Sequence, residues 1–240
     1  RASGRTAGLA IERSVELCLA HKADAMVTAP VSKEALNLAG YNFPGQTEMI
    51  ALLSRSQQVA MMLLSNELRV GLVTTHVPIA GVPPQITRER ITEKIAIFDN
   101  ALRTRFRIRA PKLAVLALNP HAGEHGVIGT EDDDIITPAI ADARSAGAQV
   151  DGPFPADAFF GRQAFRSYDA VVAMYHDQGL IPLKMTSFKK GGVNFSAGLS
   201  VIRTSPDHGT AYDIAGTGKA DIRSMIAAIT LSIRFARNKA

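Results

Sequence analysis

The chain has 240 residues, which is enough to bury the core of one large domain or of two modest ones. Hydrophobic residues make up 46% and charged residues 20%, so the composition is that of a globular protein and excludes a disordered one. No apolar run approaches the roughly 18 residues of a membrane span, and we expect a cytoplasmic protein without a membrane partner.

Apolar runs with strand character alternate along the chain with amphipathic segments of helical period. In chain order the expected elements are a helix at 6–21, a strand at 25–28, a short helix at 32–40, strands at 59–64 and 69–74, a helix at 88–103, a strand at 113–118, a helix at 132–146, strands at 170–174 and 201–204, and a helix at 221–237. This alternation predicts an α/β fold with a mostly parallel sheet covered by helices.

Two features of the composition limit the chemistry. Cys18 is the only cysteine, and its helical spacing from Ile11 and Val15 predicts a buried structural thiol and excludes an internal disulfide. The net charge of +5 would permit nucleic-acid binding, and the arginines at 103, 105, 107 and 109 alternate as on one face of a strand. No nucleic-acid-binding signature accompanies them, so we expect a solvated edge and no nucleic-acid partner.

Three of the expected strands are each followed by a histidine, namely His76, His121 and His176. The carboxyl ends of parallel strands line one crevice of an open sheet, where ligands bind. Three imidazoles at that edge predict a metal site, because imidazole is a good ligand for zinc and three protein ligands leave a position open for substrate. A single histidine at a strand end is more often a hydrogen-bonded loop residue than a metal ligand, and the spacings of the three match no short metal signature.

Polar and glycine-rich segments surround these positions. Asp177 and Asp157 are candidates for a metal ligand or for a carboxylate that orients an imidazole, and their alternative role is to cap a helix. The glycine-rich stretch 119–129 can bring backbone amides close to a ligand. A second glycine-rich loop, 207–221, precedes the last helix, although the chain contains no G-x-G-x-x-G fingerprint.

The loop H-G-T-A-Y-D-I-A-G-T-G-K-A, residues 208–220, resembles the adenosine-binding loop of the isocitrate and isopropylmalate dehydrogenase superfamily. That resemblance implies NAD, bound without a Rossmann fold. Asp213 matches the residue that accepts hydrogen bonds from the adenosine ribose. An anionic side chain there would repel the extra phosphate of NADP.

Within this superfamily the chain resembles the 4-hydroxythreonine-4-phosphate dehydrogenase family over essentially its whole length. The matching motifs are TAPVSK (28–33), GQTE (45–48), NPHAGE (119–124), GP (152–153), PAD (155–157), AMYHDQG (173–179) and RTS (203–205), together with the loop above. The resemblance implies two α/β/α lobes around a central cleft, without the family's N-terminal stretch. Residues 1–30 and 119–240 would form the cofactor-binding lobe, and residues 31–118 the central lobe for substrate and dimerisation.

The resemblance also implies roles for individual residues. His76, His121 and His176 match the metal ligands and, with Lys184, the catalytic residues, for one divalent ion per site, with zinc favoured over cobalt, magnesium or manganese. The substrate-binding positions are Gln46, Thr47, Lys184, Asn194 and Arg203. The cofactor-binding positions are Asn119, Gly123, His208, Gly209, Thr210, Asp213 and Asp221. A homodimer with shared active sites is expected.

The implied reaction is the NAD- and metal-dependent oxidation and decarboxylation of 4-phosphooxy-threonine to an amino ketone phosphate, in pyridoxal phosphate biosynthesis. One residue departs from the family pattern, because Gln46 stands where the biosynthetic enzymes have histidine. This leaves open a related dehydrogenase acting on a four-carbon sugar-acid phosphate, such as threonate or erythronate phosphate, whereas Lys184 and Arg203 argue against an unphosphorylated dihydrodiol. The alternative of another class is a noncatalytic anion- or nucleic-acid-binding protein.

Overall fold

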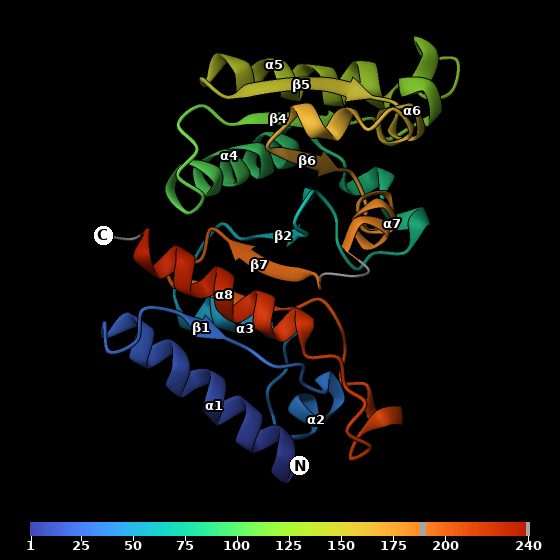
Figure 1. Ribbon diagram of the computed structural model, residues 1–240. Coiled ribbons are helices and arrows are strands. Elements are labelled where there is room, and N and C mark those ends of the chain that lie inside the picture. The colour runs from blue at the N-terminus through green and yellow to red at the C-terminus, as the bar shows by residue number, and fades with distance from the viewer. Residues whose placement is uncertain (188–190, 239–240) are drawn as a thin grey trace. The chain divides into compact units, whose positions relative to one another are not determined.

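The structure is a computed structural model that describes residues 1–187 and 191–238 (Figure 1). The chain divides into two compact units. Unit 1 contains residues 1–59 and the described part of 190–240, and unit 2 contains the described part of 60–189. The boundaries between these units differ from those of the two lobes predicted from the sequence, which lay between residues 30 and 31 and between residues 118 and 119. The assignment of the lobes to cofactor and substrate remains a prediction.

The described part of unit 1 contains three paired strands in the order β1-β8-β7. They are β1 (Met26–Val27), β8 (Arg203–Pro206) and β7 (Val193–Ala197). β1 runs parallel to β8, with Met26 opposite Arg203. β7 runs antiparallel to β8, with Asn194 opposite Ser205. This pairing brings segments from the two ends of the chain together around Arg203.

The helices of unit 1 are α1 (Ala2–Leu19), α2 (Lys33–Leu38), α3 (Gln46–Leu53) and α8 (Arg223–Arg237), with the short 3-10 turn η6 (Tyr212–Ile214). α8 lies along β8 and β7 (Figure 1). The apolar side of α1 packs through Ile11 and Val15 into a core with Met49 and Ile50 of α3. Cys18 is 5% exposed, which confirms the buried thiol. This core holds the first turn of α3, which carries Gln46 and Thr47.

In residues 60–187, unit 2 contains five paired strands in the order β2-β3-β6-β4-β5. They are β2 (Ala60–Leu64), β3 (Arg69–Leu72), β6 (Ala170–Ala173), β4 (Lys112–Leu116) and β5 (Gln149–Phe154). β2 and β3 form an antiparallel pair, whereas β3, β6, β4 and β5 are mutually parallel. The carboxyl ends of β3, β6 and β4 therefore lie at one edge, where the three histidine segments begin.

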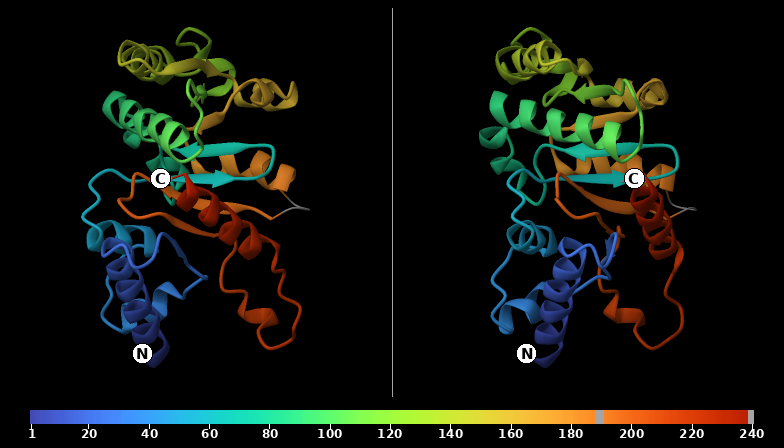
Figure 2. Two further views of the ribbon diagram at one scale, coloured as in Figure 1. Left: turned by 60° about the vertical axis from the view of Figure 1, so that its left-hand side comes forward. Right: turned by 90° about the vertical axis from the view of Figure 1, so that its left-hand side faces the viewer.

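Helices cover both faces of this sheet (Figure 2). Val70 and Leu72 of β3 pack against α7 (His176–Ser187), whereas Gly71 between them lies under the Phe98 ring of α4 (Arg88–Thr104). The alternation follows from the two-residue period of a strand. The other elements of unit 2 are η1 (Ile79–Gly81), η2 (Pro83–Gln85), η3 (Pro120–Glu124), the π-helical η4 (Asp132–Ile136), α5 (Thr137–Ser145), α6 (Ala156–Gly161) and η5 (Ala164–Ser167).

The predicted α/β class is confirmed, and the four expected strands of unit 2 lie within two residues of their predicted ends. The strand expected at 201–204 begins two residues later, as β8. The alternating arginines at 103–109 do not form a strand: α4 continues to Thr104, and Arg103 pairs on that helix with Asp99. Two strands, β5 and β7, were not predicted. Among the described residues no helix is long and apolar enough to cross a membrane.

Candidate active site

The predicted site residues are distributed over the two units. Unit 1 contains Gln46, Thr47, Asn194 and Arg203 of the substrate set, and His208, Gly209, Thr210, Asp213 and Asp221 of the cofactor set. Unit 2 contains the three histidines, Lys184, Asn119 and Gly123. The residues in unit 1 and those in unit 2 are therefore described separately.

The side chain of Arg203 is the centre of the polar group in unit 1. Its Nε and Nη2 both donate to the hydroxyl of Thr28, at 3.0 and 2.8 Å, and Nη1 donates to the hydroxyl of Ser196 at 3.1 Å. A longer contact of 3.4 Å joins Nη1 to the hydroxyl of Thr47. Thr28 and Ser196 are residues that the sequence reasoning missed. Thr28 opens a matching motif, whereas nothing in the sequence marks Ser196.

This guanidinium is almost fully removed from water, with Arg203 only 3% exposed. Burial lowers the pKa of Arg203 to about 10, and the charge of Glu48 opposes that shift, so the group remains a cation at neutral pH. Its hydrogen-bond acceptors within residues 1–187 and 191–238 are hydroxyls, with no carboxylate among them. A buried cation is costly when no carboxylate accepts its hydrogen bonds. The site therefore suits an anionic ligand.

Two buried amide oxygens belong to the same predicted set. Gln46 donates through Nε2 to the carbonyl of Ala29 at 3.2 Å, but its Oε1 is buried and has no hydrogen-bond partner among the described residues. Oδ1 of Asn194 is also buried and has no partner in the described part of the chain. Such acceptors are normally satisfied. They fit a ligand that brings a hydroxyl or ammonium donor along with its anionic group.

Two of the three predicted metal ligands come together at the strand edge of unit 2. The rings of His76 and His176 have centroids 5.6 Å apart. Beyond the strands, Val73 N donates to the carbonyl of Ala173, and Thr74 donates to the carbonyl of Met174 through both its backbone N and its hydroxyl. These bonds join the two segments that carry the histidines.

His176 is the first residue of α7, and α7 packs closely on the sheet at Gly179. A Cβ atom there would lie 2.5 Å from Val70 Cγ1. Nδ1 of His176 lies 2.6 Å from Oδ1 of Asp177. A carboxylate on one ring nitrogen is a common way of orienting a metal-binding imidazole, because it leaves Nε2 to face the ion. Lys184 lies exposed in the last turn of the same helix.

His121 lies in η3, after the end of β4, and its backbone is left-handed, with φ of 54°. In the described part of the chain, no three His, Cys, Asp or Glu side chains gather closely enough to hold a metal ion. The structure thus brings His76 and His176 together, and the complete three-histidine set remains a prediction. Asn119, two residues earlier, uses its side-chain nitrogen to donate to Glu131 and Asp132.

The loop resembling a nucleotide-binding segment is mostly exposed. Asp213 lies in η6 with its side chain in solvent. His208 contacts the carbonyl of Gly209 through Nδ1 at 3.0 Å. Asp221 forms an ion pair with Arg223, whose hydrogen bonds lower the pKa of Asp221 to about 2. Asp221 would have to share or exchange this partner to contact a cofactor.

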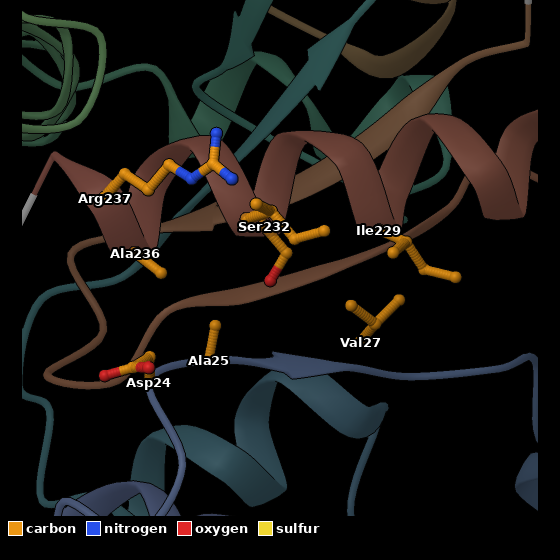
Figure 3. Close-up of a pocket in the computed structure, with 8 residues that line it drawn as sticks. Asp24, Ala25, Val27, Ile229, Ser232, Ala236 and Arg237 are labelled. Carbon is orange, nitrogen blue, oxygen red and sulfur yellow. The ribbon is translucent and has the colours of Figure 1, made fainter.

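A hollow of about 550 Å³ lies elsewhere in unit 1, between β1 and α8 (Figure 3). It is lined by Asp24, Ala25, Val27, Ile229, Ser232, Ile233, Ala236 and Arg237. None of the predicted site residues lines it. It carries no part of the proposed chemistry.

Comparison with known proteins shows the family. The family described as pyridoxal phosphate biosynthetic protein PdxA matches residues 1–232. A 4-hydroxythreonine-4-phosphate dehydrogenase of Geobacter metallireducens is 53% identical over 238 residues, covering 99% of this chain and 70% of that protein. A protein of Bradyrhizobium diazoefficiens named putative D-threonate 4-phosphate dehydrogenase is 48% identical, covering 97% and 70%.

A solved structure agrees. The crystal structure of 4-hydroxythreonine-4-phosphate dehydrogenase from Klebsiella pneumoniae has a TM-score of 0.88 and 45% identity, over 97% of this chain and 71% of that one. The similarities in sequence and in fold therefore indicate the same protein family. The chain belongs to the family of the pyridoxal phosphate biosynthetic protein PdxA, and it is an oxidoreductase of the 4-hydroxythreonine-4-phosphate dehydrogenase type.

Proposed function

We propose that the chain oxidises 4-phosphooxy-threonine with NAD and a divalent metal ion, with decarboxylation to an amino ketone phosphate in cytoplasmic pyridoxal phosphate biosynthesis. The observation that carries this proposal is the buried Arg203 guanidinium, whose hydrogen-bond acceptors in the described residues are hydroxyls, with no carboxylate among them. A planar guanidinium binds carboxylate or phosphate oxygens through strong, directional hydrogen bonds. Family membership supports the same substrate class.

The remaining substrate groups match the polar atoms described above. Oε1 of Gln46 and Oδ1 of Asn194 would accept from the substrate's ammonium or hydroxyl group, which relieves two unsatisfied acceptors. The hydroxyl of Thr47 would add a donor to an anionic oxygen. Lys184 provides a second cation, so that a substrate with both a carboxylate and a phosphate finds a partner for each.

The metal would be held by His76, His121 and His176. Two of these rings already lie side by side, and an all-imidazole set suits zinc, with cobalt, magnesium or manganese as alternatives. A bound ion would polarise the substrate hydroxyl, and bound NAD would accept the hydride. Asp177 keeps the ring of His176 oriented.

We further propose a homodimer with shared active sites. Within one chain, the described residues bring together two of the three histidines. A ligand set completed by the partner protomer would resolve this shortfall. The adenosine part of NAD would lie against residues 208–213, with Asp213 accepting from the ribose. We also assign Asn119 and Gly123 to cofactor binding.

A second candidate is the oxidation of a four-carbon sugar-acid phosphate such as threonate 4-phosphate. Gln46 favours it, because glutamine accepts from a neutral hydroxyl as well as from an ammonium group. The similar protein of Bradyrhizobium diazoefficiens bears such a name.

The test is NADH formation from 4-phosphooxy-threonine and from threonate and erythronate 4-phosphates under identical conditions. Turnover of the amino acid phosphate with the highest kcat/KM supports the proposal. A preference for a sugar-acid phosphate moves the assignment to the second candidate. Binding of anions without turnover of any of them, weakened steeply by salt, would favour a noncatalytic protein.

A further inference from the structure

The loop that carries His121 has an unusual backbone. Five consecutive residues are left-handed, with φ of 54° at His121, 55° at Ala122, 78° at Gly123, 45° at Glu124 and 53° at His125. Four of them have side chains, for which this conformation is unfavourable and normally confined to single residues. Strained backbone persists only where surrounding structure enforces it, and it concentrates at functional sites. The surroundings of this turn therefore show what holds His121.

One buried carboxylate anchors the start of the turn. Asp132 is 0% exposed, and its Oδ1 accepts from the backbone N of Leu118 at 2.8 Å. Its Oδ2 accepts from the backbone N of Asn119 at 3.1 Å and from the Asn119 side chain at 3.0 Å. All three donors immediately precede Pro120 and His121. Asp132 thus fixes the direction in which the chain enters the left-handed turn.

The same carboxylate lies beside the middle of the turn. A Cβ atom on Gly123 would meet the Gly129 carbonyl oxygen at 2.7 Å and Oδ2 of Asp132 at 3.5 Å, so the turn packs directly on both. Backbone N–H groups of Gly126 and Ile128 close the loop by donating to the carbonyl of Gly123 at 3.0 Å. His121 is therefore held between an anchored entry and a closed exit.

Asp132 is a buried carboxylate, so its negative charge has to be balanced by its surroundings. Within the described residues no lysine, arginine or histidine forms an ion pair with Asp132, so its charge is balanced by N–H donors and by its place in the first turn of a helix. Burying a carboxylate in this way is costly unless all its acceptors are used. The hydrogen bonds that offset this cost all come from Leu118 and Asn119, which lead into the turn that contains His121.

We propose that Asp132 is a positioning residue that holds His121 in the orientation needed to bind a divalent cation. The inference rests on the proposed function, in which His121 is a metal ligand. Asp132 does not touch the ion. It acts through the Leu118–Asn119 backbone, and its loss should weaken metal binding by roughly 10- to 100-fold, as for other groups that orient metal ligands.

The test uses Asp132→Asn, with Asp134→Asn as the matched control. Asp134 is an exposed carboxylate on the same helical turn, so its variant removes the same charge nearby. Cobalt(II) alone, without NAD or substrate, is titrated into each protein, and the dissociation constant and visible absorption spectrum are measured. Asp132→Asn should bind cobalt roughly 10- to 100-fold more weakly with a changed spectrum. Asp134→Asn should match the wild type.

A double variant separates positioning from general stability. If Asp132 acts through His121, adding Asp132→Asn to His121→Ala should cause no further loss of cobalt affinity. Wild-type affinity and spectrum in Asp132→Asn, even with a lowered Tm, would overturn the proposal and leave Asp132 a purely structural residue. An equal additional loss in the double variant would overturn it as well.

A second variant covers the case in which Asp132→Asn does not fold. Asn119→Ala removes one of the three hydrogen bonds to the carboxylate and leaves the two backbone donors in place. It should weaken cobalt binding by a smaller factor, of a few-fold, and unchanged affinity would contradict the proposal. Failure of the wild-type chain to bind cobalt at all would instead refute the metal centre of the proposed function.

Discussion

Arg203 and Thr28, which are 175 positions apart in the sequence, are joined by two hydrogen bonds from the guanidinium to one hydroxyl oxygen, at 3.0 and 2.8 Å. The parallel pairing of β1 with β8 makes this contact, since Val27 lies opposite Thr204 and Thr28 follows directly. The pairing fixes the plane of a buried cation. The geometry of the proposed anion site therefore depends on the sheet of unit 1.

Replacing Arg203 by methionine should separate function from stability. The variant removes a buried cation whose hydrogen bonds in the described residues go to hydroxyls and to no carboxylate, so the Tm should be unchanged or higher. The kcat/KM should fall on the order of 100-fold or more, because each hydrogen bond to a charged group contributes about 1.5–3 kcal/mol. Thermal unfolding and steady-state kinetics test both parts, and a variant with low Tm but retained kcat/KM would contradict the assignment.

Thr28→Val keeps the shape of the side chain but removes the acceptor shared by Nε and Nη2 of Arg203. The guanidinium loses its fixed plane, so we expect KM to rise about tenfold, in proportion to one charge-assisted hydrogen bond. Thr28→Ser retains the hydroxyl and should restore the wild-type KM. Equal loss in both variants would show that Thr28 contributes packing and not orientation.

Gln46→His should introduce a pH dependence that the wild type lacks at this position. A neutral imidazole accepts from the substrate's ammonium group, whereas the protonated ring repels it. Because an unperturbed histidine titrates near about 6.5, kcat/KM for 4-phosphooxy-threonine should fall in the variant as pH drops through that region. The comparison is the ratio of variant to wild-type kcat/KM from pH 5.5 to 8. A ratio independent of pH would mean that residue 46 does not face the amine.

Arg223→Ala should raise the pKa of Asp221 from about 2 toward its ordinary value of 3.8, because hydrogen bonding from the Arg223 side chain is the largest cause of the shift. A carboxyl group with a depressed pKa in the folded state stabilises that state above pH 3.8 and loses this effect as pH falls toward 2. NMR titration of the Asp221 carboxyl carbon measures the change directly. An unaltered pKa in the variant would show that the pair does not form.

Sequence patterns predicted the secondary-structure elements that are marked by a continuous run of apolar residues. The apolar runs before His76, His121 and His176 identified β3, β4 and β6, because buried parallel strands are hydrophobic on both faces. The arginines at 103–109 were misleading, since a two-residue alternation of charge competes with a helix that continues through Arg103 and its pair with Asp99.

The site itself was only partly predictable. Arg203, Thr47 and Asn194 were predicted from the family resemblance and stay predictions as substrate-binding residues. Ser196 was not predicted, because its contact with Arg203 arises from strand pairing that no local pattern encodes. The burial of Asp132 was equally hidden, since it lies in a run of three aspartates of which the other two are exposed. Tertiary register and burial decide such roles, and spacing in the sequence does not report them.

Metal dependence tests the central claim most directly. NADH formation from 4-phosphooxy-threonine should be measured on the protein after removal of metal by chelator and dialysis, and again after zinc or cobalt is restored. The proposed dehydrogenase should lose turnover without metal and regain it on addition, while His121→Ala regains none. Full turnover by the metal-free protein, or restored turnover in His121→Ala, would contradict the claim that these imidazoles hold a metal required for oxidation.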